Sequence, residues 1–117
     1  MRHKRVVVTH YGGPEVITTI EEDIPTPKAG EVRVKVLAAG VSLPDLLARE
    51  GVHPETPRVP YTPGWDLDGT LDQLGERTTG FELHQTVAAL PIHGCYAQYV
   101  CVPQRKLVPV PAGLDAA

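Results

Sequence analysis

The chain has 117 residues, enough for one domain with its own core, and its 42% hydrophobic and 21% charged residues are ordinary for a globular protein. A net charge of −3 provides no general attraction for nucleic acid, and three basic residues among the first five are too few for a nucleic-acid-binding arm. No apolar run approaches the roughly 20 residues of a membrane span and no secretory signal opens the sequence, so we expect a cytoplasmic protein that binds neither nucleic acid nor membranes.

Twelve prolines and eleven glycines predict a mostly β fold, because both residue types interrupt helices and bound short strands. A hairpin is predicted around Gly12-Gly13-Pro14, with residues 6–10 and 16–22 as its arms. After a loop, residues 32–36 alternate valine with Arg33 and Lys35, which predicts a strand with one buried face.

One short helix is predicted at residues 42–50. Ser42 suits the N-cap, Pro44 is tolerated in the first turn, and Asp45 suits the positive end of the helix dipole. Gly51 is a residue that can end the helix. The apolar stripe of this helix consists of Leu43, Leu46 and Leu47.

Prolines recur at every third position after the helix, at Pro54, Pro57, Pro60 and Pro63. This spacing matches the three-residue turn of polyproline II, which adaptor domains with aromatic grooves recognise. The other interpretation is a stiff loop that leads from the helix to a strand. Basic residues at the flanks are weak anchors, so we favour the loop.

Short strands separated by turns are predicted after Gly64, which is typical of a small β-barrel or sandwich. They fall within residues 65–75, 85–90, 95–103 and 106–111, with a turn near 75–80. In the third of these strands, Cys95 and Cys101 would lie on one face about 20 Å apart. A disulfide needs Cα atoms within roughly 7 Å, so no internal disulfide is expected.

The segments "AAGVSLPDLLAREG", "PGWDLDGTLDQLGERTTGFELHQTVAAL" and "GCYAQYVCVPQRKLVPVPAGLDAA" together resemble the N-terminal GroES-like domain of the medium-chain dehydrogenases/reductases. The similarity is to the zinc-free quinone oxidoreductase branch, and it spans nearly all of the chain. It implies a mainly β fold, a GroES-like partly open β-barrel with one short helix, as a single domain over residues 1–117.

The sequence departs from the zinc alcohol dehydrogenases of this superfamily. Those relatives carry a cysteine after the Ala-Gly-Val step and a Gly-His-Glu at the start of the barrel strand, where this chain has Ser42 and Gly64-Trp65-Asp66. A catalytic zinc needs about three Cys, His or carboxylate ligands. The four-cysteine structural zinc lobe is also missing, so the resemblance implies a site without metal.

The resemblance also implies a wall that faces the substrate or the nicotinamide. Its members are Ser42, Asp45, His53, Trp65 and Asp66. No catalytic side chain is assigned, because the cofactor supplies the hydride and the protein positions it and excludes water. Helix capping is an alternative role for Ser42 and Asp45, and closing one end of the barrel is an alternative for Trp65.

Several residues differ from those that the family prefers. Arg77 and His84 stand where relatives have glycine, and both side chains would be strained there unless the turns differ. Natural drift explains these differences, or else they form a protein-binding patch. The candidate patch comprises Asp68, Arg77, Thr78, His84, Gln85 and Cys95.

No G-x-G-x-x-G motif and no βαβ pattern occur, so the dinucleotide-binding (Rossmann) domain is absent. NADPH is implied for the full-length family enzyme, but this chain alone should bind no cofactor and be inactive. Two functions follow: the substrate-side domain of a zinc-free NADPH-dependent quinone oxidoreductase, or a truncated or engineered GroES-like scaffold that binds a protein.

The resemblance implies that the missing cofactor domain would pack on this one and cover an apolar face. Without it we expect self-association or a protein partner, because exposed apolar patches mark interaction sites. The residues expected on this face are Leu43, Leu46, Leu47, Trp65 and Leu67.

Overall fold

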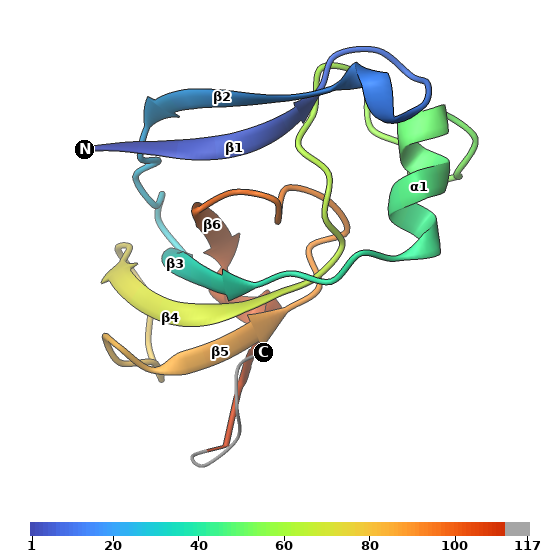
Figure 1. Cartoon of the computed structure of the whole chain (residues 1–117). Coiled ribbons are helices and arrows are strands. Elements are labelled where there is room, and N and C mark those ends of the chain that lie inside the picture. Colours follow the sequence, from blue (N-terminus) through green and yellow to red (C-terminus); the bar gives the residue numbers. More distant parts are fainter. Residues whose placement is uncertain (112–117) are drawn as a thin grey trace.

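The computed structural model describes residues 1–111. They form seven strands, one α-helix and two short 3₁₀ turns, so the predicted mainly β fold with one short helix is confirmed (Figure 1). In chain order the elements are β1 (Arg2–Val8), a turn (Pro14–Val16), β2 (Ile17–Asp23), β3 (Glu31–Ala38), α1 (Leu43–Glu50), β4 (Leu67–Leu74), β5 (Thr86–Ala89), β6 (Tyr99–Pro103), a turn (Gln104–Lys106) and β7 (Leu107–Pro109).

The predicted hairpin is confirmed, with its first strand displaced toward the N-terminus. β1 and β2 are antiparallel, with Arg2 opposite Asp23 and Val8 opposite Ile17. The first strand starts at Arg2 rather than at residue 6 because its early residues are anchored: the His3 side chain is only 2% exposed. Beyond Val8 the chain leaves the strand and reaches β2 through the turn Pro14–Val16.

The other five strands form an open antiparallel sheet in the order β6-β3-β4-β5-β7. The predicted alternation in β3 is confirmed, since Val32 and Val34 are fully buried. Gly69 of β4 lies opposite Val36, where a Cβ atom would collide with the Lys35 carbonyl oxygen. Glycine there lets β3 and β4 approach closely beside two shifts in their register.

Two groups of buried side chains form the core. The larger group lies on the five-stranded sheet, and partly buried residues such as Val36 and Phe81 pack against it. The smaller group joins β1, α1 and the following loop through Val8, Ala48 and Tyr61. Burial of the Tyr61 phenol raises its pKa, because an apolar surrounding disfavours the charged form. The members of the larger group are Val32, Val34, Leu67, Leu71, Val87, Ala89, Cys95, Val102 and Leu107.

The prediction of one continuous strand over residues 95–103 is wrong for its first half. Gly94 has a φ of 96°, and the amides of Cys95 and Tyr96 donate to carbonyl oxygens of the 63–64 segment. The amide of Gln98 donates instead to the Lys4 carbonyl oxygen, in β1. Because these partners belong to different segments, residues 94–98 cross between the hairpin and the sheet, and β6 begins only at Tyr99. The two thiols are free and do not share a face: Cys95 is fully buried and Cys101 half-buried.

The proline-rich segment is an irregular loop between α1 and β4, as we favoured. The His53 carbonyl oxygen accepts a 3.0 Å hydrogen bond from the Thr56 amide, which forms a turn that interrupts any polyproline helix. Further along, the Tyr61 and Val8 backbones exchange hydrogen bonds, and Pro63 is buried. A continuous exposed proline ladder for an adaptor domain is therefore not formed.

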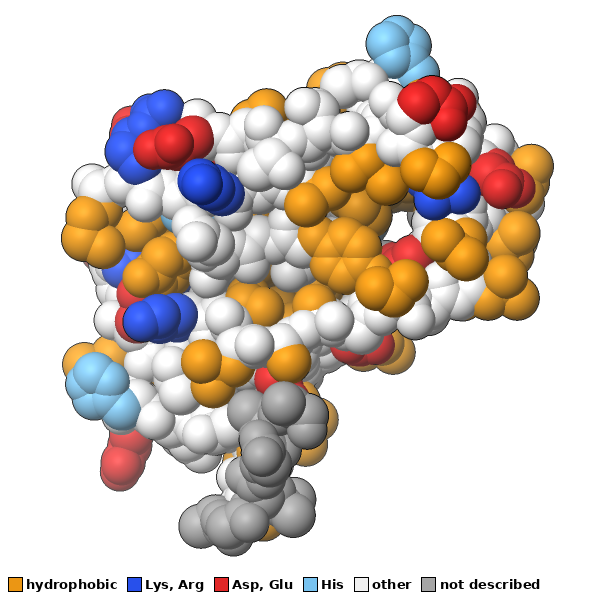
Figure 2. All heavy atoms as spheres, viewed as in Figure 1, with side chains coloured by type: hydrophobic (Ala, Val, Ile, Leu, Met, Phe, Trp, Pro, Cys, Tyr) orange, Lys and Arg blue, Asp and Glu red, His pale blue; other side chains and the backbone are white. Residues whose placement is uncertain are grey.

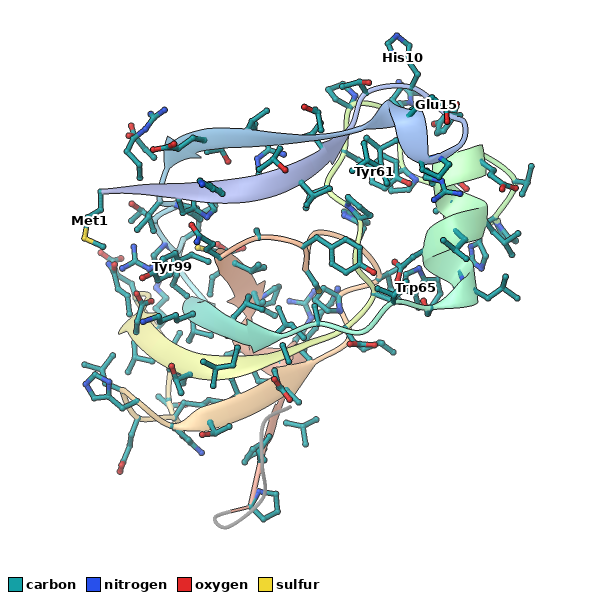
Figure 3. The ribbon with its side chains drawn as sticks, in the orientation of Figure 1. Met1, His10, Glu15, Tyr61, Trp65 and Tyr99 are labelled. Carbon is teal, nitrogen blue, oxygen red and sulfur yellow. The ribbon has the colours of Figure 1, made fainter. Side chains whose placement is uncertain are left out.

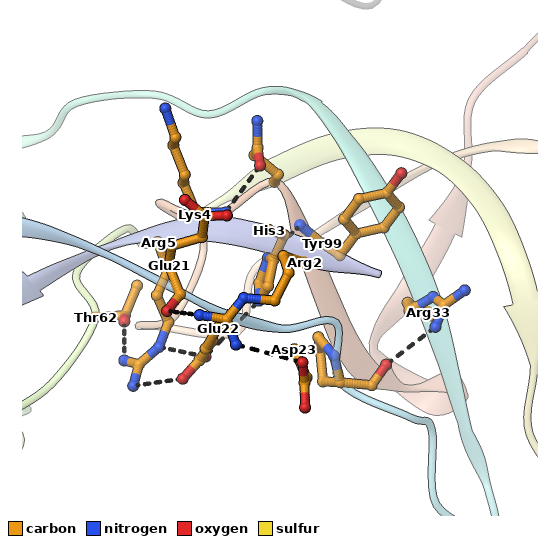
Figure 4. Close-up of polar contacts among 12 residues, drawn as sticks. Arg2, His3, Lys4, Arg5, Glu21, Glu22, Asp23, Arg33, Thr62 and Tyr99 are labelled. Atoms are coloured by element: carbon orange, nitrogen blue, oxygen red, sulfur yellow. Dashed lines mark hydrogen bonds and ion pairs between the residues drawn. The ribbon is translucent and has the colours of Figure 1, made fainter.

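Polar contacts fasten the hairpin to the rest of the fold (Figure 4). The Arg5 guanidinium binds the Glu22 carboxylate across the hairpin at 2.6 Å and donates to the Thr62 hydroxyl at 2.8 Å. The buried His3 ring accepts a hydrogen bond from the Tyr99 amide at Nδ1, 3.3 Å away. These contacts join β1 to the loop before β4 and to the start of β6.

One ion pair braces the outer face of the sheet. Arg33 on β3 binds Asp72 on β4 through two nitrogens, at 2.8 and 3.1 Å, and its guanidinium lies 5.6 Å from the centre of the Tyr99 ring. The hydrogen bond to Asp72 raises the pKa of Arg33 despite partial burial. No helix in the described part of the chain is long and apolar enough to span a membrane.

Candidate functional site

The candidate site begins where β3 leads into α1. Ser42 is extended, with φ −123° and ψ 163°, and its amide donates to Asp45 Oδ2 at 3.1 Å. This bond satisfies one backbone group that a helix start leaves free. Gly51 ends the helix in the left-handed conformation, with a φ of 82°. The predicted cap and end of the helix are confirmed, and the helix itself starts at Leu43.

The apolar stripe of α1 is largely uncovered. The helix buries Asp45 and Ala48, whereas Leu43 is 65% exposed and Leu46 41% exposed. Leu47 is half-buried. Figure 2 shows apolar side chains gathered at the α1 end of the molecule, at the right of the view. An amphipathic helix normally turns such a stripe toward a core, so this face is available for another surface.

Asp45 is the polar centre of the site, although its side chain points inward. It is 5% exposed, and Oδ1 accepts a 3.1 Å hydrogen bond from the Gly64 amide. Oδ2 accepts from the Ser42 amide and hydroxyl, the latter at 2.9 Å, and from the Tyr96 hydroxyl at 3.1 Å. All four partners are donors, which matches a carboxylate that only accepts. Asp45 therefore stabilises the wall through buried hydrogen bonds and does not itself face solvent.

Trp65 and Asp66 follow Gly64, where the backbone packs closely against Cys95 and Tyr96. Gly64 has a φ of 112°, and a Cβ there would lie 2.8 Å from the Tyr96 amide nitrogen. Only glycine fits this conformation and this space. The next two residues are half-buried, and Asp66 Oδ1 accepts a 2.8 Å hydrogen bond from the Gly40 amide. The start of α1 and the entry to β4 are thereby joined.

Trp65 lies beside α1 (Figure 3), and the His53 ring packs against it. Their ring centres are 5.3 Å apart and the planes meet at 85°, an edge-to-face arrangement. Nδ1 of His53 accepts a 3.0 Å hydrogen bond from the Glu55 amide, so the proton of the neutral imidazole is on Nε2. These contacts connect the predicted wall residues in series: Ser42 bonds to Asp45, Asp45 to the residue before Trp65, and Trp65 packs on His53, while Asp66 bonds to the turn before α1.

An open groove of about 750 Å³ adjoins this wall at the end of the five-stranded sheet. Leu90 and Val108 on its rim are 56% and 61% exposed. Asp68 Oδ1 is buried without a hydrogen-bond partner among residues 1–111. The other lining residues are mostly small or apolar: Ala38, Ala39, Gly40, Asp66, Leu67, Ala88, Ala89 and Lys106.

The residues of the predicted binding patch do not gather on one surface. Cys95 is fully buried in the core, where burial raises the pKa of its thiol to about 12, so its assignment to a patch is wrong. Asp68 lines the groove at the end of the sheet. Arg77 and His84 are exposed in the β4–β5 connection, whereas Thr78 donates to the Gly75 carbonyl oxygen and Gln85 accepts from the Glu82 amide. Leu67, expected on the apolar face, is also in the core at 3% exposure.

The strain predicted at two of these positions is confirmed. Arg77 has a φ of 61° and His84 a φ of 69°, both in the left-handed region that glycine adopts without cost. Ile92 has a φ of 81°, which the sequence did not indicate and which is unusual for a β-branched residue. These turns therefore have a backbone conformation that favours glycine, although none of the three residues is glycine.

The site residues offer little to a metal. No three His, Cys, Asp or Glu side chains within residues 1–111 are grouped so that they could hold an ion. Asp66 is the only carboxylate of the predicted wall that is not buried, and it is already bonded to Gly40. The Ser42 hydroxyl donates its hydrogen bond to Asp45, and its oxygen lone pairs stay free. It can therefore accept a hydrogen bond from a ligand group such as a carboxamide N–H.

Sequence reasoning missed Tyr96, which completes the site from the far end of the chain. Its hydroxyl lies 2.9 Å from the Gly40 carbonyl oxygen and 3.1 Å from Asp45 Oδ2. Burial, together with the Asp45 charge, raises the pKa of this phenol. No local pattern could have found it, because Tyr96 and Asp45 are 51 positions apart.

Comparisons with known proteins agree with this architecture. The family model described as the alcohol dehydrogenase GroES-like domain matches residues 28–112. Among curated proteins, the quinone oxidoreductase of the guanaco, Lama guanicoe, is 34% identical over 115 residues, which covers 96% of this chain and 34% of that protein. The chain therefore spans about a third of the length of this relative.

Solved structures give the same relationship. The human synaptic vesicle membrane protein VAT-1 homolog-like protein superposes with a TM-score of 0.94 at 28% identity, over 99% of this chain and 38% of that one. A mycobacterial protein solved in complex with NADPH superposes with a TM-score of 0.86 at 26% identity, over 97% of this chain and 35% of its own.

Proposed function

Since the chain belongs to the alcohol dehydrogenase GroES-like domain family, in the quinone oxidoreductase branch of the medium-chain dehydrogenases/reductases, we propose that it is the substrate-side domain of a zinc-free, NADPH-dependent quinone oxidoreductase. The observation that carries the proposal is the wall formed by Ser42, Trp65 and Asp66, bonded together through Gly40 and Asp45.

The absence of zinc from the proposed mechanism is supported by the chemistry of the wall. Ser42 and Trp65 provide no thiolate and no imidazole at the positions where zinc relatives have ligands. The Asp66 carboxylate accepts a hydrogen bond from the Gly40 amide, and the buried Asp45 carboxylate accepts one from the Gly64 amide. The Asp66 carboxylate and the His53 imidazole are the remaining candidate ligands of the wall, fewer than the three of a catalytic zinc.

NADPH supplies a hydride when it is bound by a complete enzyme. The residues of this chain position the reactants. Trp65 offers an apolar ring against which a quinone can pack, and His53 fixes that ring edge-to-face. Ser42 presents an acceptor, and the exposed leucines of α1 keep water from the adjoining surface once a second domain covers them.

The partner in this proposal is a cofactor domain of the same polypeptide. The chain spans about a third of the guanaco relative, and an apolar groove lies beside the wall. A domain that packs on the groove and on α1 would bury Leu43, Leu90 and Val108. Alone, the chain has no phosphate-binding loop to hold NADPH, so we expect it to be inactive without the cofactor domain. We expect the complete enzyme to act in the cytoplasm.

A chimera tests the proposal. Residues 1–117 replace the matching N-terminal third of the guanaco quinone oxidoreductase, and NADPH oxidation is followed with a soluble quinone. We expect turnover in the chimera, none in the isolated chain, and no stoichiometric zinc by elemental analysis. A folded chimera that binds NADPH yet reduces no quinone, or that retains about one zinc per chain after dialysis against a weak chelator, contradicts it.

A second candidate function is a protein-binding module on the same fold. It is favoured by the uncovered stripe of α1, in which Leu43 and Leu46 are 65% and 41% exposed. In this case the partner is a protein with an apolar surface, and binding needs no nucleotide. A complex that forms through α1 and is indifferent to NADPH distinguishes this function from the first.

A further inference from the structure

The Tyr96 side chain connects three parts of the candidate site. Its hydroxyl meets the Gly40 carbonyl oxygen at 2.9 Å, in the turn before α1, and Asp45 Oδ2 at 3.1 Å, in the first turn of the helix. Its backbone is fixed as well: the amide donates to Pro63, and the carbonyl oxygen accepts from Val6. The ring is half-buried, so the hydroxyl cannot move far from these partners.

The Asp45 carboxylate links the Tyr96 hydroxyl to the start of α1. Of its four donors, the Ser42 amide and hydroxyl belong to the start of α1 itself. The Gly64 amide and the Tyr96 hydroxyl come from other segments, at 3.1 Å each, and they fix the helix against the rest of the fold. The amide of Gly40, on the same turn that Tyr96 contacts, donates to Asp66.

We propose that Tyr96 is a positioning residue of the candidate site: its hydroxyl lies between the Gly40 carbonyl oxygen and Asp45 Oδ2, shares its one proton between them, and so sets the distance between Ser42 on one side of the wall and Trp65 and Asp66 on the other. Removal of the hydroxyl takes away the one proton that these two acceptors share, and Asp45 Oδ2 then has only the Ser42 amide and hydroxyl as donors. The start of α1 is then free to shift, and the wall opens or closes with it. The inference rests on the proposed function only in treating this wall as the substrate side.

The test compares Tyr96→Phe with Tyr99→Phe in the isolated chain. Both changes remove one hydroxyl from a half-buried tyrosine, and the Tyr99 hydroxyl has no hydrogen-bond partner among the residues that the structure describes. Two native-state measurements report the wall directly: the amide chemical shifts of Gly40, Ser42 and Gly64, and the quenching by acrylamide of the single tryptophan, Trp65.

We expect Tyr96→Phe to move these three amide resonances and to change the acrylamide quenching of Trp65, while circular dichroism stays unchanged. Tyr99→Phe should alter neither. A role limited to stability would lower the unfolding midpoint and leave both native-state signals in place. Equal spectra for the two variants therefore overturn the proposal.

Binding of duroquinone, followed by Trp65 emission, adds a functional readout. Its four methyl groups block addition of the Cys95 and Cys101 thiols. We expect Tyr96→Phe to weaken saturable quenching by about five- to tenfold, the factor that one hydrogen bond represents, and Tyr99→Phe to leave it unchanged. Equal affinity in both variants contradicts the positioning role. If the unaltered chain binds no duroquinone while the Tyr96→Phe resonances move, the positioning role stands and the proposed substrate class fails.

Discussion

Gly40 and Asp66 are joined by a 2.8 Å hydrogen bond from the Gly40 amide to Oδ1 of the carboxylate, across 26 positions of sequence. A Cβ on Gly40 would lie 3.1 Å from both carboxylate oxygens, so glycine permits this approach. The bond joins the turn before α1 to the entry of β4. It is the shortest link between the two halves of the wall, and its contribution can be measured.

Asp66→Ala should lower the free energy of unfolding by about 1 kcal/mol, because a hydrogen bond to a half-exposed carboxylate is lost. Asp66→Asn retains an acceptor oxygen and should lose less than half of that amount. Urea unfolding measures both, with Asp23→Ala as control, since the Asp23 side chain is 88% exposed. An equal loss in the Ala and Asn variants would show that the Gly40 bond contributes little.

The buried thiol of Cys95 should make the fold sensitive to alkali. Burial raises the pKa of Cys95 from 9.0 to about 12, with the nearby Asp66 and Asp45 charges acting in the same direction. The folded state therefore holds this proton more tightly than the unfolded state. Its stabilisation is complete below pH 9.0 and is lost as the pH rises toward about 12.

Unfolding free energies at a series of pH values check this expectation. One such group changes stability by at most about 1.4 kcal/mol per pH unit above its unfolded pKa. Cys95→Ala should flatten the alkaline slope even though the cavity it leaves lowers stability at neutral pH. A slope that is unchanged in Cys95→Ala assigns the alkaline sensitivity to other groups.

Arg77→Gly and His84→Gly should each stabilise the protein. Both residues have a φ above 60° in exposed turns, where an L-residue pays about 1–2 kcal/mol and glycine avoids that strain. Glycine costs about 0.5–1 kcal/mol of extra chain entropy, which leaves a net gain of about 0.5 kcal/mol. Arg105→Gly, in the exposed turn Gln104–Lys106 without a positive φ, should destabilise instead. Thermal unfolding of the three variants measures this gain, and a lower midpoint in Arg77→Gly or His84→Gly contradicts it.

The isolated chain should associate with itself through the face of α1. Leu43 is 65% exposed, and burial of a large apolar side chain contributes roughly 1.5–3 kcal/mol, so a few such contacts suffice at high concentration. Sedimentation velocity should show association that weakens in Leu43→Gln and Trp65→Gln. Leu83→Gln, at a 50% exposed leucine of another loop, serves as the matched control. A monomer at every concentration tested is the contrary result.

Local patterns predicted most of the elements. The alternation at residues 32–36 and the helix bounded by Ser42 and Gly51 were confirmed, because each depends on neighbours in sequence. The unusual turns at Arg77 and His84 were predicted from the residues that relatives carry there. Family resemblance thus revealed backbone strain that composition alone would not.

The remainder depends on contacts between distant segments. Residues 94–98 read as a strand, yet their amides find partners on β1 and near Gly64, which no local pattern encodes. Asp45 was assigned to a wall that faces the substrate, whereas its buried carboxylate accepts hydrogen bonds from Gly64 and Tyr96. Leu67 was expected on the surface, but it is buried, because it packs in a core formed with side chains from the other strands of its sheet.

The bonds between β1 and residues 96–99 have a consequence for synthesis on the ribosome. The hairpin leaves the exit tunnel first, but the groups that bind its inner edge lie 94 positions later, as Lys4 and Gln98 show. A two-stranded hairpin alone is marginally stable in water. A nascent chain arrested before Tyr96 therefore has the contacts of β1 with Tyr61 and Thr62 but lacks those with residues 96–99, and emergence of the next few residues adds these contacts and completes the candidate site.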